Sequence, residues 1–349
     1  VYLAYDTAED RTVEIKEFMP DTLCKRADDG ENVLVRDGGL PLYKSYLSEF
    51  ADLHKTIISD MAASCLKREF NIFSANNTGY VVSEHLNGMT LEDYIAQNGG
   101  KMQWSDISDW VRKILATLDD LHEKGIVHRG ISPSTLFVTK EGRLVMTSIA
   151  ISAARTSDSQ INCEMFPGYS ASEQYDLSER QGSWTDIYAL SAVMYNALTG
   201  ITPPDAGSRK DNDTLVPPAE AESTIPANVA EAITDGMRVN GSERTHNIGT
   251  LVQQLFDKAY DDSDTKIADP DNDGPISPIV SVKLEPEYPQ REKKRSSVPT
   301  KADIKKKKQH QKKMSNIGTV IGIVIFFSLV AIPLLAEVQN GITVLSEKS

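Results

Sequence analysis

A run of 20 residues without a charged side chain, from 317 to 336, constrains this 349-residue chain more than any other feature of its sequence. At 1.5 Å per residue, a helix of that length spans about 30 Å, which matches the hydrocarbon core of a bilayer. The alternative is a buried core helix, but such helices rarely stay apolar on every face over this length. The sequence therefore predicts one transmembrane helix over residues 317–336.

The charges on either side of this run predict its orientation. Residues 291–313 carry 11 basic and 2 acidic side chains, whereas residues 1–290 carry a net charge of −21. By the positive-inside rule the bulk of the chain is cytoplasmic, and residues 337–349 form a short tail outside. Six lysines close to the run could bind anionic lipid headgroups, at about 1 kcal/mol each, or serve to set the topology alone. They are Lys305, Lys306, Lys307, Lys308, Lys312 and Lys313.

The overall composition excludes several classes of protein. With 40% hydrophobic and 25% charged residues the chain is neither wholly disordered nor a multi-span membrane protein. A net charge of −13 argues against a nucleic-acid partner. Cys24, Cys65 and Cys163 are too few and too scattered for a disulfide framework or a zinc site. We therefore expect a folded protein of a reducing compartment.

Residues 261–316 differ in composition from what precedes them. They are rich in Pro, Asp, Ser and Lys, which is typical of a disordered linker. Asp269, Asp271 and Asp273 copy the first half of an EF-hand loop, but its twelfth position is Val280, where calcium needs a bidentate glutamate. We predict no calcium site there.

Residues 1–260 have the pattern of an α+β domain. Strands are expected over 1–6 and 12–18, followed by a polar loop, a helix over 43–61, and strands near 70–74 and 79–84. Apolar residues then recur at helical spacing over 110–121, and residues 186–198 form an apolar helix that Gly200 can close. A small β-rich lobe, 1–86, thus precedes a larger helical lobe, 87–260.

Several short motifs follow one another along these two lobes. They are VEIK at 13–16, a glutamate at 49, YVVSEHL at 80–86, HRG at 128–130, GYSASEQY at 168–175, an aspartate at 186 and an arginine at 244. In type and order they resemble the eukaryotic-type Ser/Thr protein kinase domain that bacteria place ahead of a single membrane span. The resemblance covers much of residues 1–259 and implies a two-lobed kinase-like fold.

The resemblance also assigns roles to individual residues. Lys16 would hold the α- and β-phosphates of ATP and Glu49 would pair with it, either as a working phosphate clamp or as a structural ion pair. Ser83 would be the gatekeeper of the nucleotide pocket. In the large lobe, Glu173 and Arg244 would form an ion pair.

Three positions depart from the family pattern, and they are the catalytic ones. The aspartate that positions the substrate hydroxyl is Gly130, the metal-binding asparagine is Thr135, and the metal-binding aspartate is Ser148. Magnesium is a hard cation that favours carboxylates, and hydroxyls alone would bind it weakly. The sequence therefore predicts no intact catalytic residue and no metal site.

The nucleotide pocket departs from the pattern as well. Glu14 replaces the small alanine that packs on the adenine ring in this family. A carboxylate in an apolar slot costs several kcal/mol unless it finds a partner or takes up a proton, or unless the strand shifts and the side chain reaches solvent. We therefore do not expect ordinary ATP binding. Val1 falls where the strand after the glycine-rich loop begins, so we expect this sequence to lack that loop.

These features predict a membrane-anchored pseudokinase, which acts by binding a protein partner such as an active kinase. One alternative is an active Ser/Thr kinase that transfers the γ-phosphate of ATP without the usual carboxylates. A second alternative is an inert cytoplasmic anchor for an exported C-terminal segment, which requires that the chain continues past Ser349.

Overall fold

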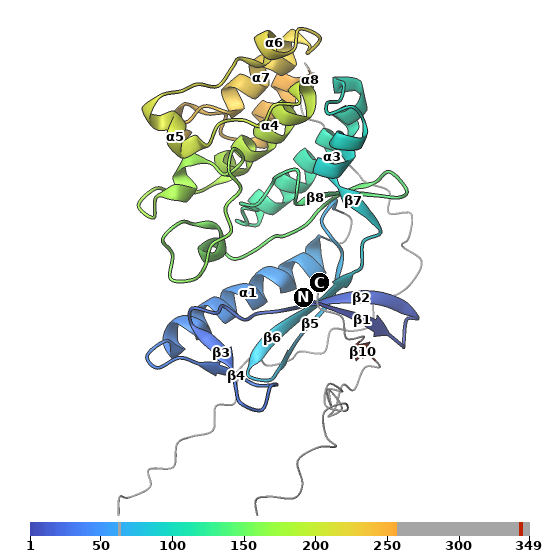
Figure 1. Cartoon of the computed structure of the whole chain (residues 1–349), viewed down its shortest axis with the longest axis vertical. Coiled ribbons are helices and arrows are strands. Elements are labelled where there is room, and N and C mark those ends of the chain that lie inside the picture. The colour runs from blue at the N-terminus through green and yellow to red at the C-terminus, as the bar shows by residue number, and fades with distance from the viewer. Residues whose placement is uncertain (62–63, 257–341, 345–349) are drawn as a thin grey trace, which may run out of the picture.

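The computed structural model describes residues 1–61, 64–256 and 342–344. Figure 1 shows two lobes, a small one built on a β-sheet and a larger, mostly helical one. The predicted α+β, two-lobed architecture is thus confirmed.

The small lobe is an antiparallel sheet with strand order β10-β1-β2-β6-β5. Its strands are β1 Tyr2–Asp6, β2 Arg11–Glu17, β5 Glu69–Ala75, β6 Thr78–Glu84 and β10 Ile342–Val344. Alternate residues of β2 face opposite sides: Val13 and Ile15 are buried in one apolar cluster, and Glu14 and Lys16 face the other way. β2 therefore presents both charged side chains toward the region between the lobes.

One long helix covers the sheet. It is α1, Leu40–Asp60, which was predicted over 43–61. Its buried face carries Tyr43, Leu47 and Phe50, which pack with Phe18 of the small lobe in one cluster. Because these positions repeat every three to four residues, the helix buries one stripe and leaves the other face in solvent.

The predicted polar loop between β2 and α1 is instead a hairpin. Its strands are β3, Cys24–Arg26, and β4, Val33–Val35, and they pair in antiparallel fashion. Leu23, Cys24 and Val33 are buried in the same cluster as α1. The sequence analysis missed the hairpin because its strands are short and its turn, 27–32, is strongly polar.

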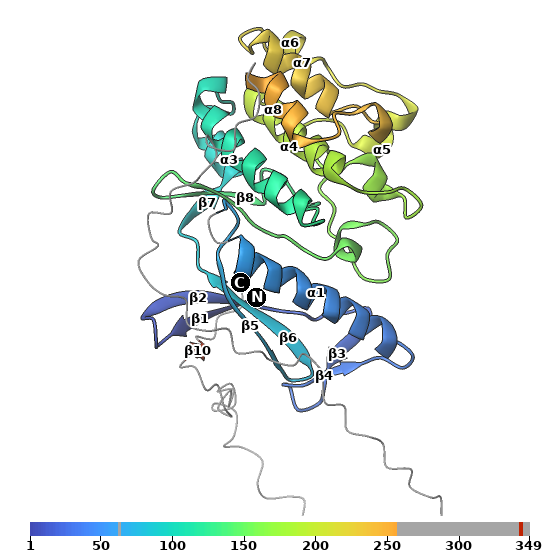
Figure 2. The same cartoon turned by 180° about the vertical axis from the view of Figure 1, so that it is seen from behind.

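The large lobe is a helical body with one small sheet on the side that faces the small lobe (Figure 2). The sheet comprises β7 Gly88–Thr90, β8 Leu136–Thr139 and β9 Leu144–Met146. The helices are α2 Leu91–Gln97, α3 Trp104–Glu123, α4 Ser183–Thr199, α5 Ala206–Asp211, α6 Pro218–Ala221, α7 Ala227–Gly236 and α8 Ile248–Phe256. Helices α3 and α4 were both predicted from their apolar residues.

Helix α4 is the centre of the large lobe. Apart from its ends, nearly every side chain is buried, which explains its almost continuous apolar sequence. It ends at Gly200, whose left-handed φ of 73° confirms the predicted C-cap.

Several predictions concern residues outside the described part of the chain. They are the linker 261–316 with its lysines, the EF-hand-like segment and the span 317–336. No helix within residues 1–61 and 64–256 is long and apolar enough to cross a membrane. Strand β10 pairs with β1, whereas the sequence predicts residues 337–349 on the far side of a membrane.

Candidate functional site

The loop between α3 and β8 holds the HRG motif, and a buried carboxylate shapes it. Asp186 of α4 accepts hydrogen bonds from the backbone N–H groups of His128, at 2.8 Å, and Arg129, at 2.7 Å. The Nε2 atom of His122 lies 2.8 Å from the same carboxylate. Burial alone would raise the pKa of Asp186, but hydrogen bonding and charge interaction with His122 outweigh it and the pKa is lowered. Asp186 is therefore a charged anchor of this loop.

A second buried carboxylate anchors the segment that holds the GYSASEQY motif, residues 168–175. Glu173 forms an ion pair with Arg244 at 2.8 Å, and both side chains are almost inaccessible to solvent. The hydroxyl of Thr185 in α4 donates to the same carboxylate at 2.8 Å. The predicted Glu173–Arg244 pair is confirmed, and it joins the GYSASEQY motif to the core.

The three positions to which the resemblance assigns catalytic roles, Gly130, Thr135 and Ser148, are linked by contacts in the structure. The hydroxyl of Thr135 is buried; it donates to the carbonyl of Gly130 at 2.6 Å and accepts from the N–H of Ser132 at 2.9 Å. Its hydrogen-bonding capacity is thus used within the loop. Ser148 is exposed, with a left-handed φ of 64°. Among the residues that the structure describes, no group of three His, Cys, Asp or Glu side chains is placed to hold a metal ion.

The space beside Gly130 is filled by the side chain of Arg155. A Cβ atom on Gly130 would lie 2.9 Å from Nε of Arg155 and 3.4 Å from its Nη2. Arg155 is 3% exposed, and its guanidinium donates to the carbonyl of Ser148 at 2.7 Å and pairs with the carboxylate of Glu164. A positive charge thus occupies the place where the family resemblance implies a carboxylate. The sequence analysis did not identify Arg155, because its position 25 residues beyond Gly130 carries no motif.

The predicted ion pair between Lys16 and Glu49 is not present in the structure. Nζ of Lys16 donates to the carbonyl of Ile149 at 3.1 Å. Glu49 is exposed and accepts from the N–H of Ser152, at 3.0 Å, and from its hydroxyl, at 3.2 Å. The segment after β9 supplies partners to both charges, so they do not pair with each other.

Burial perturbs Lys16 strongly. Desolvation lowers its pKa to about 8; Glu69 partly opposes this shift and Arg155 adds to it. Glu69, at the start of β5, also lies 2.8 Å from Nδ1 of the buried His54 in α1. Sequence reasoning missed Glu69, which no motif marks.

Glu14 pairs with other side chains, which is one of the three outcomes that the sequence left open. Its carboxylate pairs with Nζ of Lys67 and with Nδ1 of His85, the latter at 3.0 Å. Burial alone would raise the pKa of Glu14, but the hydrogen bonds from Lys67 and His85 lower it. Ser83, the predicted gatekeeper, is buried and opposite Glu14 in the β2–β6 register. The charged cluster of Glu14, Lys67 and His85 therefore lies at the strand position that packs on adenine in the family that this sequence resembles.

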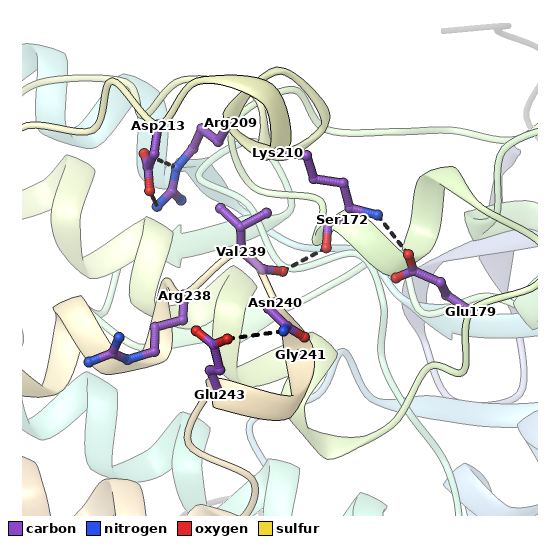
Figure 3. Close-up of a pocket in the computed structure, with 10 residues that line it drawn as sticks. All are labelled: Ser172, Glu179, Arg209, Lys210, Asp213, Arg238, Val239, Asn240, Gly241 and Glu243. Atoms are coloured by element: carbon purple, nitrogen blue, oxygen red, sulfur yellow. Dashed lines mark hydrogen bonds and ion pairs between the residues drawn. The ribbon is translucent and has the colours of Figure 1, made fainter.

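A hollow of about 440 Å³ lies elsewhere in the large lobe (Figure 3). Its lining residues are Ser172, Glu179, Arg209, Lys210, Asp213, Arg238, Val239, Asn240, Gly241 and Glu243. The three basic and three acidic side chains balance, and two pairs are already formed, Lys210–Glu179 and Arg209–Asp213. The lining has no excess charge to select an ionic ligand.

Comparison with known proteins matches this chain to protein kinases. The family description "Protein kinase domain" matches residues 50–258, more than half of the chain. A probable serine/threonine-protein kinase of Clostridium acetobutylicum is 28% identical over 218 residues, which is 58% of this chain and 32% of that protein. Serine/threonine-protein kinase PrkC of Bacillus subtilis is 32% identical over 135 residues, 37% of this chain and 20% of that protein.

A solved structure, "PpkA-294 apo form", is similar with a TM-score of 0.60 and 25% sequence identity. The alignment covers 73% of this chain and 90% of that one. The chain spans about a third or less of the length of the two kinases named above.

Proposed function

Because the chain belongs to the protein kinase domain family, we propose that it is a pseudokinase, a kinase-like domain that binds a protein partner and does not transfer phosphate. The observation that carries this proposal is the guanidinium of Arg155 beside Gly130. A kinase uses a carboxylate there to accept the proton of the substrate hydroxyl. Arginine stays protonated in proteins and cannot act as that base.

The metal-binding positions support the same proposal. Magnesium in a kinase bridges the phosphates and is held by carboxylate and amide oxygens. Here the corresponding side chains are hydroxyls, and that of Thr135 is already bonded within its loop. These residues do not fit a magnesium ion.

The nucleotide side of the cleft supports it as well. Lys16, which the family uses on the phosphates, is bonded to the carbonyl of Ile149. Glu14 pairs with Lys67 and His85 at the strand position next to adenine. ATP binding in the family manner would require both arrangements to change.

A second candidate, an active Ser/Thr kinase, is favoured by two observations. The lysine of the VEIK motif is retained and partly buried, and similar proteins carry kinase names. In this candidate Lys16 would leave Ile149 and bind phosphates.

We further propose that residues 317–336 anchor the chain in a membrane with the kinase-like domain on the cytoplasmic side. The uncharged run and the preceding lysines support this proposal. The lysines Lys305–Lys308, Lys312 and Lys313 would then contact anionic headgroups. The inert-anchor alternative predicts the same location but no protein partner.

A phosphotransfer assay separates the two main candidates. The full chain is incubated with γ-labelled ATP, generic protein substrates, and magnesium or manganese. We expect labelling no higher than that of Lys16→Ala, because the position of the proton-accepting carboxylate is Gly130 and the guanidinium of Arg155 lies beside it. Turnover that Lys16→Ala abolishes would contradict the pseudokinase proposal.

Thermal unfolding tests nucleotide binding independently. A ligand that binds the folded state at a hundred times its Kd adds about 2.7 kcal/mol of stability. We expect millimolar Mg-ATP to leave the melting temperature of the full chain unchanged. A rise in the melting temperature without phosphotransfer would agree with a pseudokinase. It would contradict the inference that Glu14 and its partners block the nucleotide pocket.

A further inference from the structure

A glutamate of β5 lies on the face of the small-lobe sheet that carries Lys16. Glu69 is opposite Ser83 in the β5–β6 register, and Ser83 is opposite Glu14 in the β2–β6 register. Side chains that oppose each other across antiparallel strands point to the same face, as do residues two apart along one strand. Glu14, Lys16 and Glu69 therefore share one face of the sheet.

Helix α1 supplies a partner to Glu69 on that face. Nδ1 of His54 lies 2.8 Å from both carboxylate oxygens of Glu69, and the two side chains are 1% and 8% exposed. Burial lowers the pKa of His54 more than Glu69 raises it, so we assign the neutral form, which donates its Nδ1 proton to Glu69. Nε2 of His54 then carries no proton, in agreement with its lack of a hydrogen-bond partner among the residues that the structure describes. A neutral imidazole orients the carboxylate but does not balance its charge.

Lys16 approaches the same part of α1 from β2. Its Nζ atom lies 6.0 Å from the centre of the Phe50 ring, and the His54 ring packs edge-on against that ring with the two centres 4.4 Å apart. Of the charged groups that act on the ammonium of Lys16, Glu69 has the largest effect, and it favours the charged form. Lys16, His54 and Glu69 thus meet around Phe50.

The glutamate that the family resemblance assigns to Lys16 faces elsewhere. Glu49 is exposed, and its carboxylate accepts from the N–H and the hydroxyl of Ser152. Glu49 and His54 are five positions apart on α1, which corresponds to about 140° around the helix axis. The side of α1 that meets Glu69 is therefore not the side that carries Glu49.

We propose that Glu69 of β5, oriented by His54, is the counter-ion of Lys16 in place of Glu49. The proposal goes beyond the proposed function, because it concerns the charge of Lys16 whether or not the cleft transfers phosphate. In a pseudokinase the three residues form a structural charge cluster that joins β2, β5 and α1. In an active kinase Glu69 would support Lys16 on the phosphates.

The pH dependence of Lys16 acetylation tests the counter-ion in the full chain. Trace acetic anhydride acetylates only neutral amines, so the rate at Lys16, measured by peptide mass spectrometry against an added amine of known pKa, rises with pH through the pKa of Lys16. In the parent we expect the midpoint at about pH 8. In Glu69→Gln we expect it to fall by about one pH unit, because the charge that favours the ammonium is removed.

Glu49→Gln is the matched control, because it removes the same charge from the residue that the family resemblance assigns to Lys16. We expect its midpoint to equal that of the parent. Glu69→Asp retains the charge and should keep a midpoint above that of Glu69→Gln. An equal midpoint in Glu69→Gln and the parent, or a fall in Glu49→Gln as large as that in Glu69→Gln, would overturn the proposal.

Titration of His54 provides a second measurement, which leaves Glu69 in place and holds even where Glu69→Gln does not fold. The charge of Lys16 contributes to the lowered pKa of His54. In histidine-selective NMR of the full chain, with the His54 signal identified by His54→Asn, we expect the midpoint of His54 to rise in Lys16→Met. Lys25→Met, at an exposed position of β3, should leave it unchanged. An unchanged His54 midpoint in Lys16→Met would place Lys16 outside the cluster and overturn the proposal.

Discussion

Two cationic side chains between the lobes donate to consecutive carbonyls, and Arg155 is buried whereas Lys16 is partly buried. Arg155 donates to the carbonyl of Ser148 and Lys16 to that of Ile149. A guanidinium keeps its proton in such a place, whereas a lysine can release its own. Desolvation lowers the pKa of Lys16 to about 8, so this side chain can lose its proton at moderately alkaline pH. Burial of Lys16 therefore makes the stability of the domain depend on pH.

The sign of this dependence follows from the shift. In the unfolded chain Lys16 has its ordinary pKa of 10.5. Between about pH 8 and 10.5 the unfolded chain binds a proton that the folded chain has released, so stability rises with pH. Below pH 8 the full cost of the buried charge is present.

We expect the free energy of unfolding of the parent, relative to Lys16→Met, to rise by up to about 3 kcal/mol from pH 8 to 10.5. Denaturant unfolding at a series of pH values measures this difference. Lys25→Met, at an exposed position of β3, serves as the control and should show no such trend. A difference for Lys16→Met that does not vary with pH would mean that the lysine stays charged in the fold.

At the scale of elements, local sequence predicted the long helices better than the short strands. Helix α4 has an unbroken apolar sequence and a glycine at its end, and each of these signals is local. The β3–β4 hairpin has three residues in each strand, and its stability depends on packing against α1 and residues 151–161. The apolar side chains of the hairpin find packing partners only once the whole domain has folded.

The end of α4 provides a direct test of this local signal. Gly200 has a left-handed φ, and a Cβ there would lie 2.8 Å from the carbonyl oxygen of Gly100. We expect Gly200→Ala to lower the free energy of unfolding by at least about 1 kcal/mol, because both the conformation and the contact disfavour a side chain.

Gly249→Ala in α8 is the matched control. Its added Cβ would meet just Asn247 Oδ1, at an ordinary 3.6 Å. We expect this change to be neutral or to stabilise by up to about 1 kcal/mol. Equal effects of the two substitutions in denaturant unfolding would show that the cap geometry does not matter.

At the scale of the whole molecule, two arrangements of the C-terminal end exclude each other. The structure pairs Ile342–Val344 with β1 of the small lobe. A single crossing by residues 317–336 would place these residues on the opposite side of a membrane from that lobe. The location of the full chain in cells distinguishes the two arrangements.

We expect the full chain to remain with the membrane fraction after alkaline carbonate extraction. Phe326→Arg with Leu329→Arg should release it, because two arginines at the centre of a span cost about 6 kcal/mol. Ser296→Arg with Ser297→Arg adds the same charge within the basic strip and should leave the chain with the membranes. A soluble parent chain would contradict the predicted anchor and favour the pairing of β10 with β1.

The sequence by itself determined the two lobes and the long helices, and its resemblance indicated the family and predicted the loss of three catalytic side chains. The lobes and helices depend on residue type and periodicity along the chain, which are local properties, whereas the family and the catalytic positions are what the resemblance implies. It also marked Glu173 and Arg244, because the resemblance assigns each a position in a motif.

The tertiary structure alone decided what replaces the lost groups. Arg155 beside Gly130, Lys16 on the carbonyl of Ile149 and Glu14 with Lys67 are contacts between distant parts of the chain. Lys16 and Glu14 each gain a partner that no motif specifies, and Arg155 pairs with Glu164 as well as with the carbonyl of Ser148. Such partners are chosen by burial and by distance in the folded molecule, because a charge removed from water is stabilised by whichever donor or acceptor the packing brings within reach.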